Sequence, residues 1–111
     1  LGRLNDAVAQ FQETLRINPQ LADAHNNLGV TLDRLGQLDQ AISQYQQAIA
    51  ARPDYPRAYF NLGVALVKAG RIDPAVSAFE TAIRLKPDYA EAQTNLAAIR
   101  AAGNVPAAPK P

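Results

Sequence analysis

A spacing of 34 residues constrains this chain more than any other feature of its sequence. The stretch AHNNLGV, residues 24–30, returns as AYFNLGV at 58–64 and in a more divergent form as AQTNLAA at 92–98. Glycines, aromatic residues and prolines elsewhere keep the same spacing, including Gly2, Gly36 and Gly70, Phe11, Tyr45 and Phe79, and Pro19, Pro53 and Pro87. A period of this length is typical of stacked helix pairs, which bury their apolar faces only against their neighbours. The spacing therefore predicts a helical repeat protein.

The apolar residues within one unit recur at helical spacing. Leu28, Leu32 and Leu35 lie on one side of a first helix, which Gly36 ends, and Pro53 prevents a second helix from continuing. We therefore expect an all-α chain without strands and with Pro19, Pro53 and Pro87 in the turns between units. The six expected helices cover residues 5–17, 22–35, 39–52, 56–69, 73–86 and 90–102.

Several residues indicate how these helices begin and pack. Asn5, Asp39 and Asp73 occupy equivalent positions and are good N-cap types, so we expect them to start the second helix of each pair. We expect Pro56 to open the central first helix. We place Gly29 and Gly63, with Ala97 in the third copy, on the buried side, because a glycine inside a helix costs about 1 kcal/mol relative to alanine and close packing explains its repeated use.

The repeated pattern resembles the tetratricopeptide repeat. It consists of Leu28, Gly29, Leu32, Gly36, Ala41, Tyr45, Ala48 and Pro53, and it returns as Leu62, Gly63, Leu66, Gly70, Ala75, Phe79, Ala82 and Pro87. The resemblance implies a right-handed α-solenoid of antiparallel helix pairs whose first helices line a concave groove for protein or peptide segments. It divides residues 1–102 into a leading second helix (1–21), two full repeats (22–55 and 56–89) and a trailing first helix (90–102).

Three asparagines at equivalent positions raise a specific hypothesis about the groove. Asn27, Asn61 and Asn95 each precede a buried residue of the pattern, although asparagine is an indifferent helix former. Duplication alone explains their repetition, and each could bond a neighbouring helix or face water. Alternatively, their carboxamides could hydrogen-bond to the backbone of an extended peptide. That arrangement resembles the asparagine ladder in the tetratricopeptide superhelix of O-linked N-acetylglucosamine transferases.

The rest of the expected groove mixes apolar and polar residues. Phe60, Val64 and Val67 follow one another at helical spacing, and either superhelical packing covers this stripe or it contacts a partner's apolar side chains. The remaining candidate groove residues are Asn26, Val30, Arg34, Arg57 and Lys68. A further mode of the family, the basic clamp for C-terminal carboxylates, is rejected because Asn26, Val30, Glu91 and Asn95 occupy much of that set's places.

Charge and composition argue against other classes of function. Eleven basic and ten acidic residues give a net charge of +1, which does not favour a nucleic-acid or membrane partner. An RNA-binding helical repeat remains the alternative, because such proteins use units of similar length. The single histidine, His25, has a packing position in the repeat and cannot build a histidine-rich metal site. We expect no catalysis, cofactor or metal.

The two ends of the chain lead to further expectations. The chain has no initiator methionine and opens within a repeat, so we expect a segment of a larger scaffold or targeting protein, in a compartment that the sequence leaves open with the cytoplasm slightly favoured. The helix carrying Val8, Phe11 and Leu15 lacks a preceding first helix, which predicts self-association and, as an alternative function, a self-assembling scaffold. Residues 103–111, rich in Pro and Ala, are expected to form a linker or tail.

Overall fold

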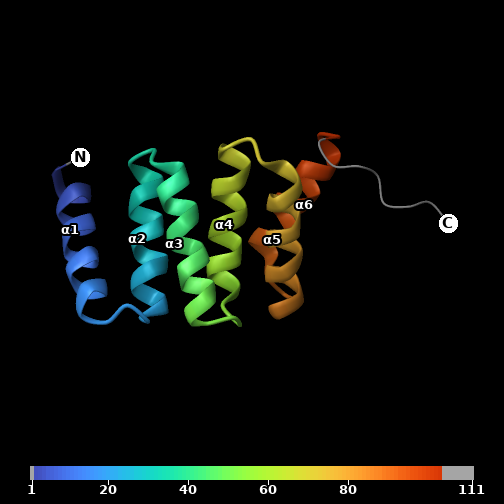
Figure 1. The fold of residues 1–111 in the computed structure, drawn as a ribbon. Helices are drawn as coiled ribbons and strands as arrows, with labels where there is room; N and C mark the ends of the chain where they lie inside the picture. Colours follow the sequence, from blue (N-terminus) through green and yellow to red (C-terminus); the bar gives the residue numbers. More distant parts are fainter. Residues whose placement is uncertain (1, 104–111) are drawn as a thin grey trace.

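The computed structural model describes residues 2–103 and contains six α-helices in this range, without strands. The helices form antiparallel pairs in a solenoid, stacked from one end of the molecule to the other (Figure 1). Their bounds agree with the expected ranges to within a residue or so, except that α1 starts three residues earlier. They are α1 (Gly2–Ile17), α2 (Ala22–Arg34), α3 (Leu38–Ala51), α4 (Pro56–Lys68), α5 (Ile72–Leu85) and α6 (Ala90–Ala101).

Glycine ends the first helix of each pair, as predicted. Gly36 and Gly70 have φ angles of 77° and 79°, a backbone region that side chains with a Cβ rarely adopt. Beyond Gly36, the Gln37 N–H donates to the Leu32 carbonyl over 2.9 Å, and Arg71 donates to Leu66 over 2.8 Å in the next repeat. These bonds satisfy carbonyls that the helix ends would otherwise leave free. The prolines expected in the turns, Pro19, Pro53 and Pro87, lie in the connections between units.

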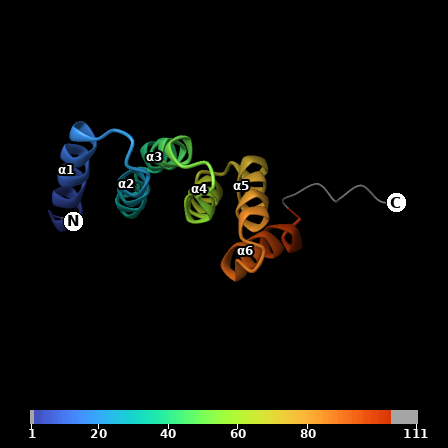
Figure 2. The same cartoon turned by 90° about the horizontal axis from the view of Figure 1, so that it is seen from below.

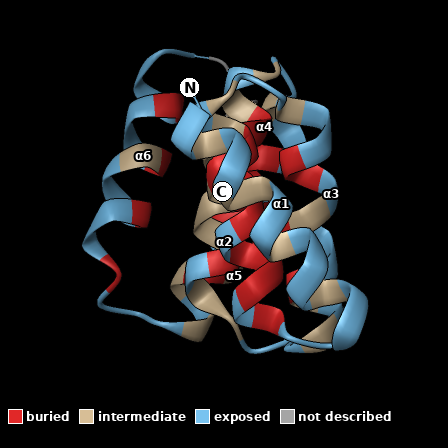
Figure 3. Cartoon of the chain, turned by 90° about the vertical axis from the view of Figure 1, so that its left-hand side faces the viewer, coloured by how far each residue is buried: buried red, intermediate tan, exposed pale blue. Residues whose placement is uncertain are grey.

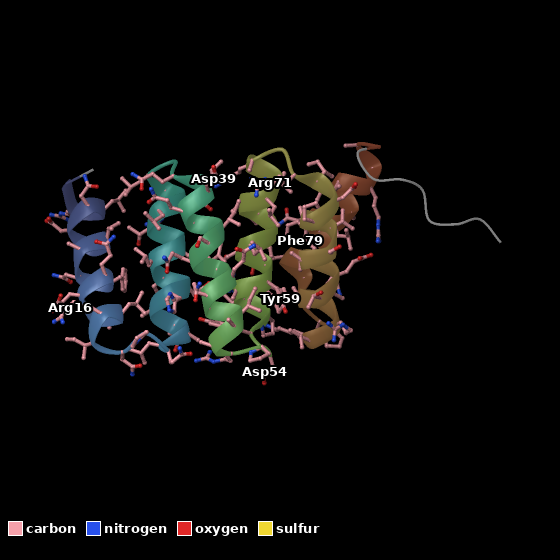
Figure 4. All side chains as sticks on the ribbon, in the orientation of Figure 1. Arg16, Asp39, Asp54, Tyr59, Arg71 and Phe79 are labelled. Atoms are coloured by element: carbon pink, nitrogen blue, oxygen red, sulfur yellow. The ribbon has the colours of Figure 1, made fainter. Side chains whose placement is uncertain are left out.

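The expected N-caps are wrong at all three positions. Gln37 and Arg71 occupy the N-cap positions of α3 and α5, and neither side chain makes a capping hydrogen bond. Asp39 and Asp73 lie inside the first turn of those helices, and Asn5 lies within α1. An acidic side chain in the first turn interacts favourably with the helix dipole without accepting a capping bond. Asp39 also faces Arg71 over 3.7 Å, near the upper ends of the central helices in Figure 4. Pro56 does open α4, as expected.

The core confirms the close packing that the repeated glycines of the pattern predict. A Cβ built on Gly29 would lie 2.5 Å from Cε1 of Tyr45, and one built on Gly63 would lie 2.8 Å from Cε1 of Phe79. Both rings are only 1% exposed, so they have little room to retreat. The absence of a side chain at each glycine therefore lets a first helix approach the ring of the following helix.

The last repeat copy keeps a hydrogen bond to the preceding turn, although the residue that makes it has changed. The ring nitrogens of His25 lie 2.8 Å from Oε1 of Gln44 and 2.7 Å from the Pro19 carbonyl oxygen, so His25 is a packing residue. Gln93, 68 positions later, donates to the equivalent carbonyl of Pro87 over 2.6 Å. A carboxamide thus replaces the imidazole in fixing α6 to the preceding turn.

The two terminal helices are covered less than the central ones. Ala97, expected on the buried side, is exposed, because no further helix of residues 2–103 packs on that side of α6. No residue of α1 is buried, and Figure 3 shows this helix in the colours of exposed and intermediate residues. Residues 104–111, which include most of the expected tail, lie outside the described residues.

Candidate functional site

The first helices α2, α4 and α6 lie along one side of the array, with α3 and α5 along the other (Figure 2). We call the surface between α2 and α4 the first junction and the surface between α4 and α6 the second junction. Repetition places equivalent residues at the two junctions, 34 positions apart. Side-chain contacts can therefore be compared position by position between the two junctions.

Polar side chains at the first junction are bonded to one another. Asn61 Nδ2 donates to Asn26 Oδ1 over 3.0 Å, and the Tyr55 hydroxyl donates to Asp23 Oδ1 over 2.7 Å. The Arg52 guanidinium also reaches Asp23, over 3.3 Å. Burial and the bond to Asp23 raise the pKa of Tyr55 to about 12, and the bonds from Tyr55 and Arg52 lower the pKa of Asp23. This network occupies hydrogen-bonding groups that a partner would need.

Two ion pairs join neighbouring first helices. Lys68 Nζ lies 2.8 Å from Asp33 Oδ1, whose side chain is only 13% exposed, and so connects α4 to α2. Arg57 lies 3.5 Å from Glu91 and connects α4 to α6, with both side chains at least half exposed. Exposed pairs of this kind contribute about 0–1 kcal/mol, so the second pair can exchange partners at little cost.

Aromatic rings replace the polar network at the second junction. Phe60 stands where the first junction has Asn26, and its ring centroid lies 5.8 Å from that of Phe79 and 5.3 Å from that of Tyr89. The Arg57 guanidinium lies 5.4 Å from the centroid of the Tyr89 ring. The Tyr89 hydroxyl is buried and has no hydrogen-bond partner among the described residues. The second junction thus combines apolar contacts with unused hydrogen-bonding capacity.

Two hollows follow the second junction, and Asn95 borders both. One has a volume of about 360 Å³ and the other of about 370 Å³. The first is lined mainly by apolar side chains, with Lys68 and Asn95 as its polar members. Its apolar lining comes from Val64, Val67, Phe79, Ala98, Ile99 and Ala102. The second is lined by Phe60, Ala90, Glu91, Thr94 and Asn95.

The three asparagines of the predicted ladder therefore have different surroundings. Asn27 is exposed on α2, whereas Asn61 is half-buried and bonded to Asn26. Asn95 is also half-buried, but its repeat neighbour is Phe60, and no hydrogen bond of its side chain to another described residue is formed. Of these three carboxamides, only that of Asn95 borders the two hollows and makes no hydrogen bond to another described residue.

The other predicted groove residues divide between the two junctions. Asn26 is 5% exposed and Val30 is half-buried, both on α2, while Arg34 is exposed in the last turn of that helix. Val64 and Val67 on α4 are half-buried, so packing covers their stripe in part and leaves the rest to the hollow. Arg57 and Lys68 are engaged in the ion pairs described above.

Sequence reasoning missed Tyr89 and Lys86, which come together beside Arg57. A signal for them exists in the repeat, because Tyr89 matches Tyr55 and Arg57 takes the place of Asp23. A tyrosine that keeps its position while its acidic partner changes sign indicates a broken contact. Among the described residues no group of three potential metal ligands comes together, and no helix is long and apolar enough to cross a membrane.

Comparison with protein families gives matches over most of the chain. The family described as TPR repeat matches residues 1–36 and 34–70, and the family described as tetratricopeptide repeat matches residues 56–89. No curated protein sequence matches this chain.

Solved structures show the same fold in several proteins. A crystal structure of MamA superimposes with a TM-score of 0.85 at 29% identity, covering 90% of this chain and 59% of that one. The O-GlcNAc transferase of Thermobaculum terrenum gives a TM-score of 0.79 at 26% identity over 86% of this chain, which corresponds to only 18% of the enzyme. The first TPR of Spaghetti (RPAP3), bound to an HSP90 peptide, gives 0.89 at 23% identity, covering 94% and 82%.

Proposed function

This chain belongs to the tetratricopeptide repeat family, and we propose that it binds an extended segment of a partner protein along the second junction. Tetratricopeptide repeats are typically protein-interaction modules, and no catalytic domain is evident among residues 2–103. The chain spans 59% of the MamA chain it resembles, and the activity of any larger protein lies beyond this proposal.

The observation that carries the proposal is the apolar hollow beside Asn95. Its lining of Val64, Val67, Phe79 and Ile99 suits an aliphatic side chain of a partner, since each buried methylene contributes about 0.8 kcal/mol. The carboxamide of Asn95 borders the hollow and can donate to or accept from a peptide backbone. Apolar and backbone contacts of this kind hold extended segments in protein grooves.

The length of the second junction fits a short peptide. Eleven residues separate Arg57 from Lys68 on α4, which corresponds to about 16 Å of helix. An extended chain rises about 3.3 Å per residue, so about five partner residues can lie along this surface. In this arrangement Phe60 and Val64 contact alternate side chains, and Asn95 contacts the backbone between them.

A displayed library of random peptides, selected against the 111-residue chain, tests the proposal. Val64→Asn should weaken the selected peptides about tenfold, which corresponds to about 1.4 kcal/mol. Val30→Asn is the matched control, because Val30 is the equivalent valine of the first junction and is also half-buried. It should change affinity less than twofold. Failure to select peptides, or equal losses in both variants, would contradict the proposal.

Self-association through α1 is a second candidate, favoured by the exposure of its apolar face. Phe11 is only partly buried, whereas its equivalents Tyr45 and Phe79 are 1% exposed. A hollow of about 470 Å³ is also lined by residues of α1, α2 and α3. Sedimentation should show association that increases with concentration and weakens in Phe11→Gln. A monomer at high concentration would rule out this second function.

A further inference from the structure

A buried tyrosine hydroxyl lies among cationic side chains at one end of the second junction. Tyr89 is 3% exposed, and its hydroxyl has no hydrogen-bond partner among the described residues. Lys86 Nζ lies 4.9 Å from the ring centroid, and the Arg57 guanidinium lies 5.4 Å from it. A buried donor without an acceptor is costly, so its presence beside two cations needs an explanation.

The first junction shows what fills the equivalent place. There Asp23 accepts hydrogen bonds from the Tyr55 hydroxyl and from Arg52. In the next repeat, 34 positions later, Tyr89 is equivalent to Tyr55, Lys86 to Arg52 and Arg57 to Asp23. The tyrosine and the cation are kept, but the carboxylate between them is replaced by a second cation. The second junction thus has the donors of a carboxylate site without the carboxylate that occupies it in the first.

A hollow of about 230 Å³ lies at these residues, lined by Tyr55, Pro56, Arg57, Lys86 and Tyr89. Since one water occupies about 30 Å³ of liquid, the hollow has room for a carboxylate and the methylene group that carries it. Arg57 and Lys86 are exposed, and long exposed side chains can move to admit a ligand.

We propose that Arg57, Lys86 and the Tyr89 hydroxyl bind the carboxylate of an aspartate or glutamate side chain from the partner segment. The carboxylate takes the place that Asp23 takes in the first junction, accepting one hydrogen bond from the tyrosine and others from the two cations. Charge-assisted hydrogen bonds of this type are shorter and stronger than neutral ones. These three residues are not the positions of the basic clamp rejected above.

Glu91 is the acidic group that competes for this site. Its carboxylate lies 3.5 Å from Arg57, and both side chains are at least half exposed. The burial of Tyr89 raises its pKa, Arg57 opposes that shift, and Glu91 adds to it, so both charges act on the hydroxyl. A partner carboxylate must displace Glu91 from Arg57, and removal of the Glu91 charge should therefore strengthen binding.

Sodium acetate is the simplest probe, because it supplies a carboxylate without any groove contact. We expect saturable chemical-shift changes at Arg57, Lys86 and Tyr89 in an NMR titration, compared with sodium chloride at equal ionic strength. Tyr89→Phe should weaken acetate binding at least threefold, and Glu91→Gln should strengthen it about twofold. The matched control, Tyr59→Phe, removes the hydroxyl of a tyrosine that lines a different hollow, and it should leave acetate binding unchanged.

Arg57→Asp is the most specific variant, because it restores the carboxylate that the first junction has. Its own carboxylate should accept from Tyr89 and Lys86, and acetate binding should disappear. The proposal is overturned if acetate and chloride give the same changes, if Tyr89→Phe binds acetate as well as the parent, or if Arg57→Asp still binds acetate.

The source of the carboxylate is tested with two peptide libraries, and this arm rests on the proposed function. Peptides fused to the display protein through their C-terminus can supply only side-chain carboxylates, whereas a second library supplies free C-termini. We expect the first library to enrich an acidic residue on the parent and to lose that enrichment on Arg57→Asp. Enrichment from the second library alone would overturn the assignment to a side chain. Loss of all peptide binding with acetate binding kept would contradict the proposed function and not the carboxylate site.

Discussion

The two full repeats share one scaffold, but the junctions between their first helices differ. Each repeat places a glycine of its first helix against a fully buried ring of its second helix, Gly29 on Tyr45 and Gly63 on Phe79. On the groove side, however, the first junction bonds Asn61 to Asn26, and the second leaves Asn95 beside Phe60. Duplication kept the contacts that stack the helices. It did not keep the polar pairing that closes the groove.

The two junctions therefore contain two kinds of polar side chain: those that are hydrogen-bonded within the protein and those that are free to bond to a ligand. A carboxamide that is bonded within the protein contributes to stability, whereas one that borders an apolar hollow without a partner can bond to a ligand at no internal cost. We therefore expect mutations at the first junction to change stability and mutations at the second to change binding.

The largest effects should come from the shared scaffold, and they should be equal in the two full repeats. Leucine at either glycine would overlap a buried ring that has little room to move, so Gly29→Leu and Gly63→Leu should each cost on the order of 1–3 kcal/mol or more. Thermal melts followed by circular dichroism would then show a loss of about 4–8 °C per kcal/mol. An unchanged melting temperature for either variant would show that the packing contact is misplaced.

The next effect distinguishes the two junctions directly. Asn61→Ala leaves Oδ1 of the buried Asn26 without its donor and should cost about 1–3 kcal/mol. Asn95→Ala removes no internal bond and should leave stability unchanged or slightly higher, since alanine is the better helix former. Chemical denaturation of both variants measures the difference. Equal losses would mean that the two asparagines have the same structural role.

Binding should show the reverse order. Asn95→Ala should weaken selected peptides by about 0.5–1.5 kcal/mol without changing which peptides are preferred, because a backbone contact does not depend on side chains. Phe60→Ala should change the preference itself by removing an apolar contact. Affinities of a small peptide panel, measured by calorimetry, separate the two outcomes. A changed preference in Asn95→Ala would contradict the backbone contact.

How far the sequence could predict this structure depends on how local each signal is. Periodic leucines, the glycine after each first helix and the prolines between units act within one helix or turn, and they gave the helix bounds. The N-caps were wrong because Asp39 and Asp73 favour the helix N-terminus in more than one position. Their residue type identifies the first turn but not the place within it.

The groove could not be predicted in the same way, because its pairings join non-equivalent positions. Asn61 bonds Asn26, which lies 35 residues away and is not part of the repeated asparagine series. Asn27, Asn61 and Asn95 look alike in sequence, yet the residue opposite each one decides its role. The equivalent positions that differ between the repeats, Asn26 against Phe60 and Asp23 against Arg57, indicate these roles, whereas the repeated asparagines do not.

The smallest expected effect is the pH dependence of the stability that Asp23 contributes at the first junction. The bonds from Tyr55 and Arg52 lower the pKa of Asp23, so its contribution to stability is present above the unfolded value of about 3.9 and is lost as pH falls through the lower folded value. Asp23→Asn should melt at a slightly lower temperature than the parent at pH 7, because exposed pairs contribute little. The gap should close below about pH 4. A gap independent of pH would exclude this role of the charge.

The most direct test of the division between the junctions is an amide NMR map of the chain with one selected peptide. Perturbed residues should cluster on α4 between Arg57 and Lys68 and on α6 around Asn95, with α2 nearly unchanged. Intermolecular nuclear Overhauser effects should place a peptide side chain against Val64 and Val67. Perturbations that are as large on α2 as on α6, or that lie on α3 and α5, would contradict the account.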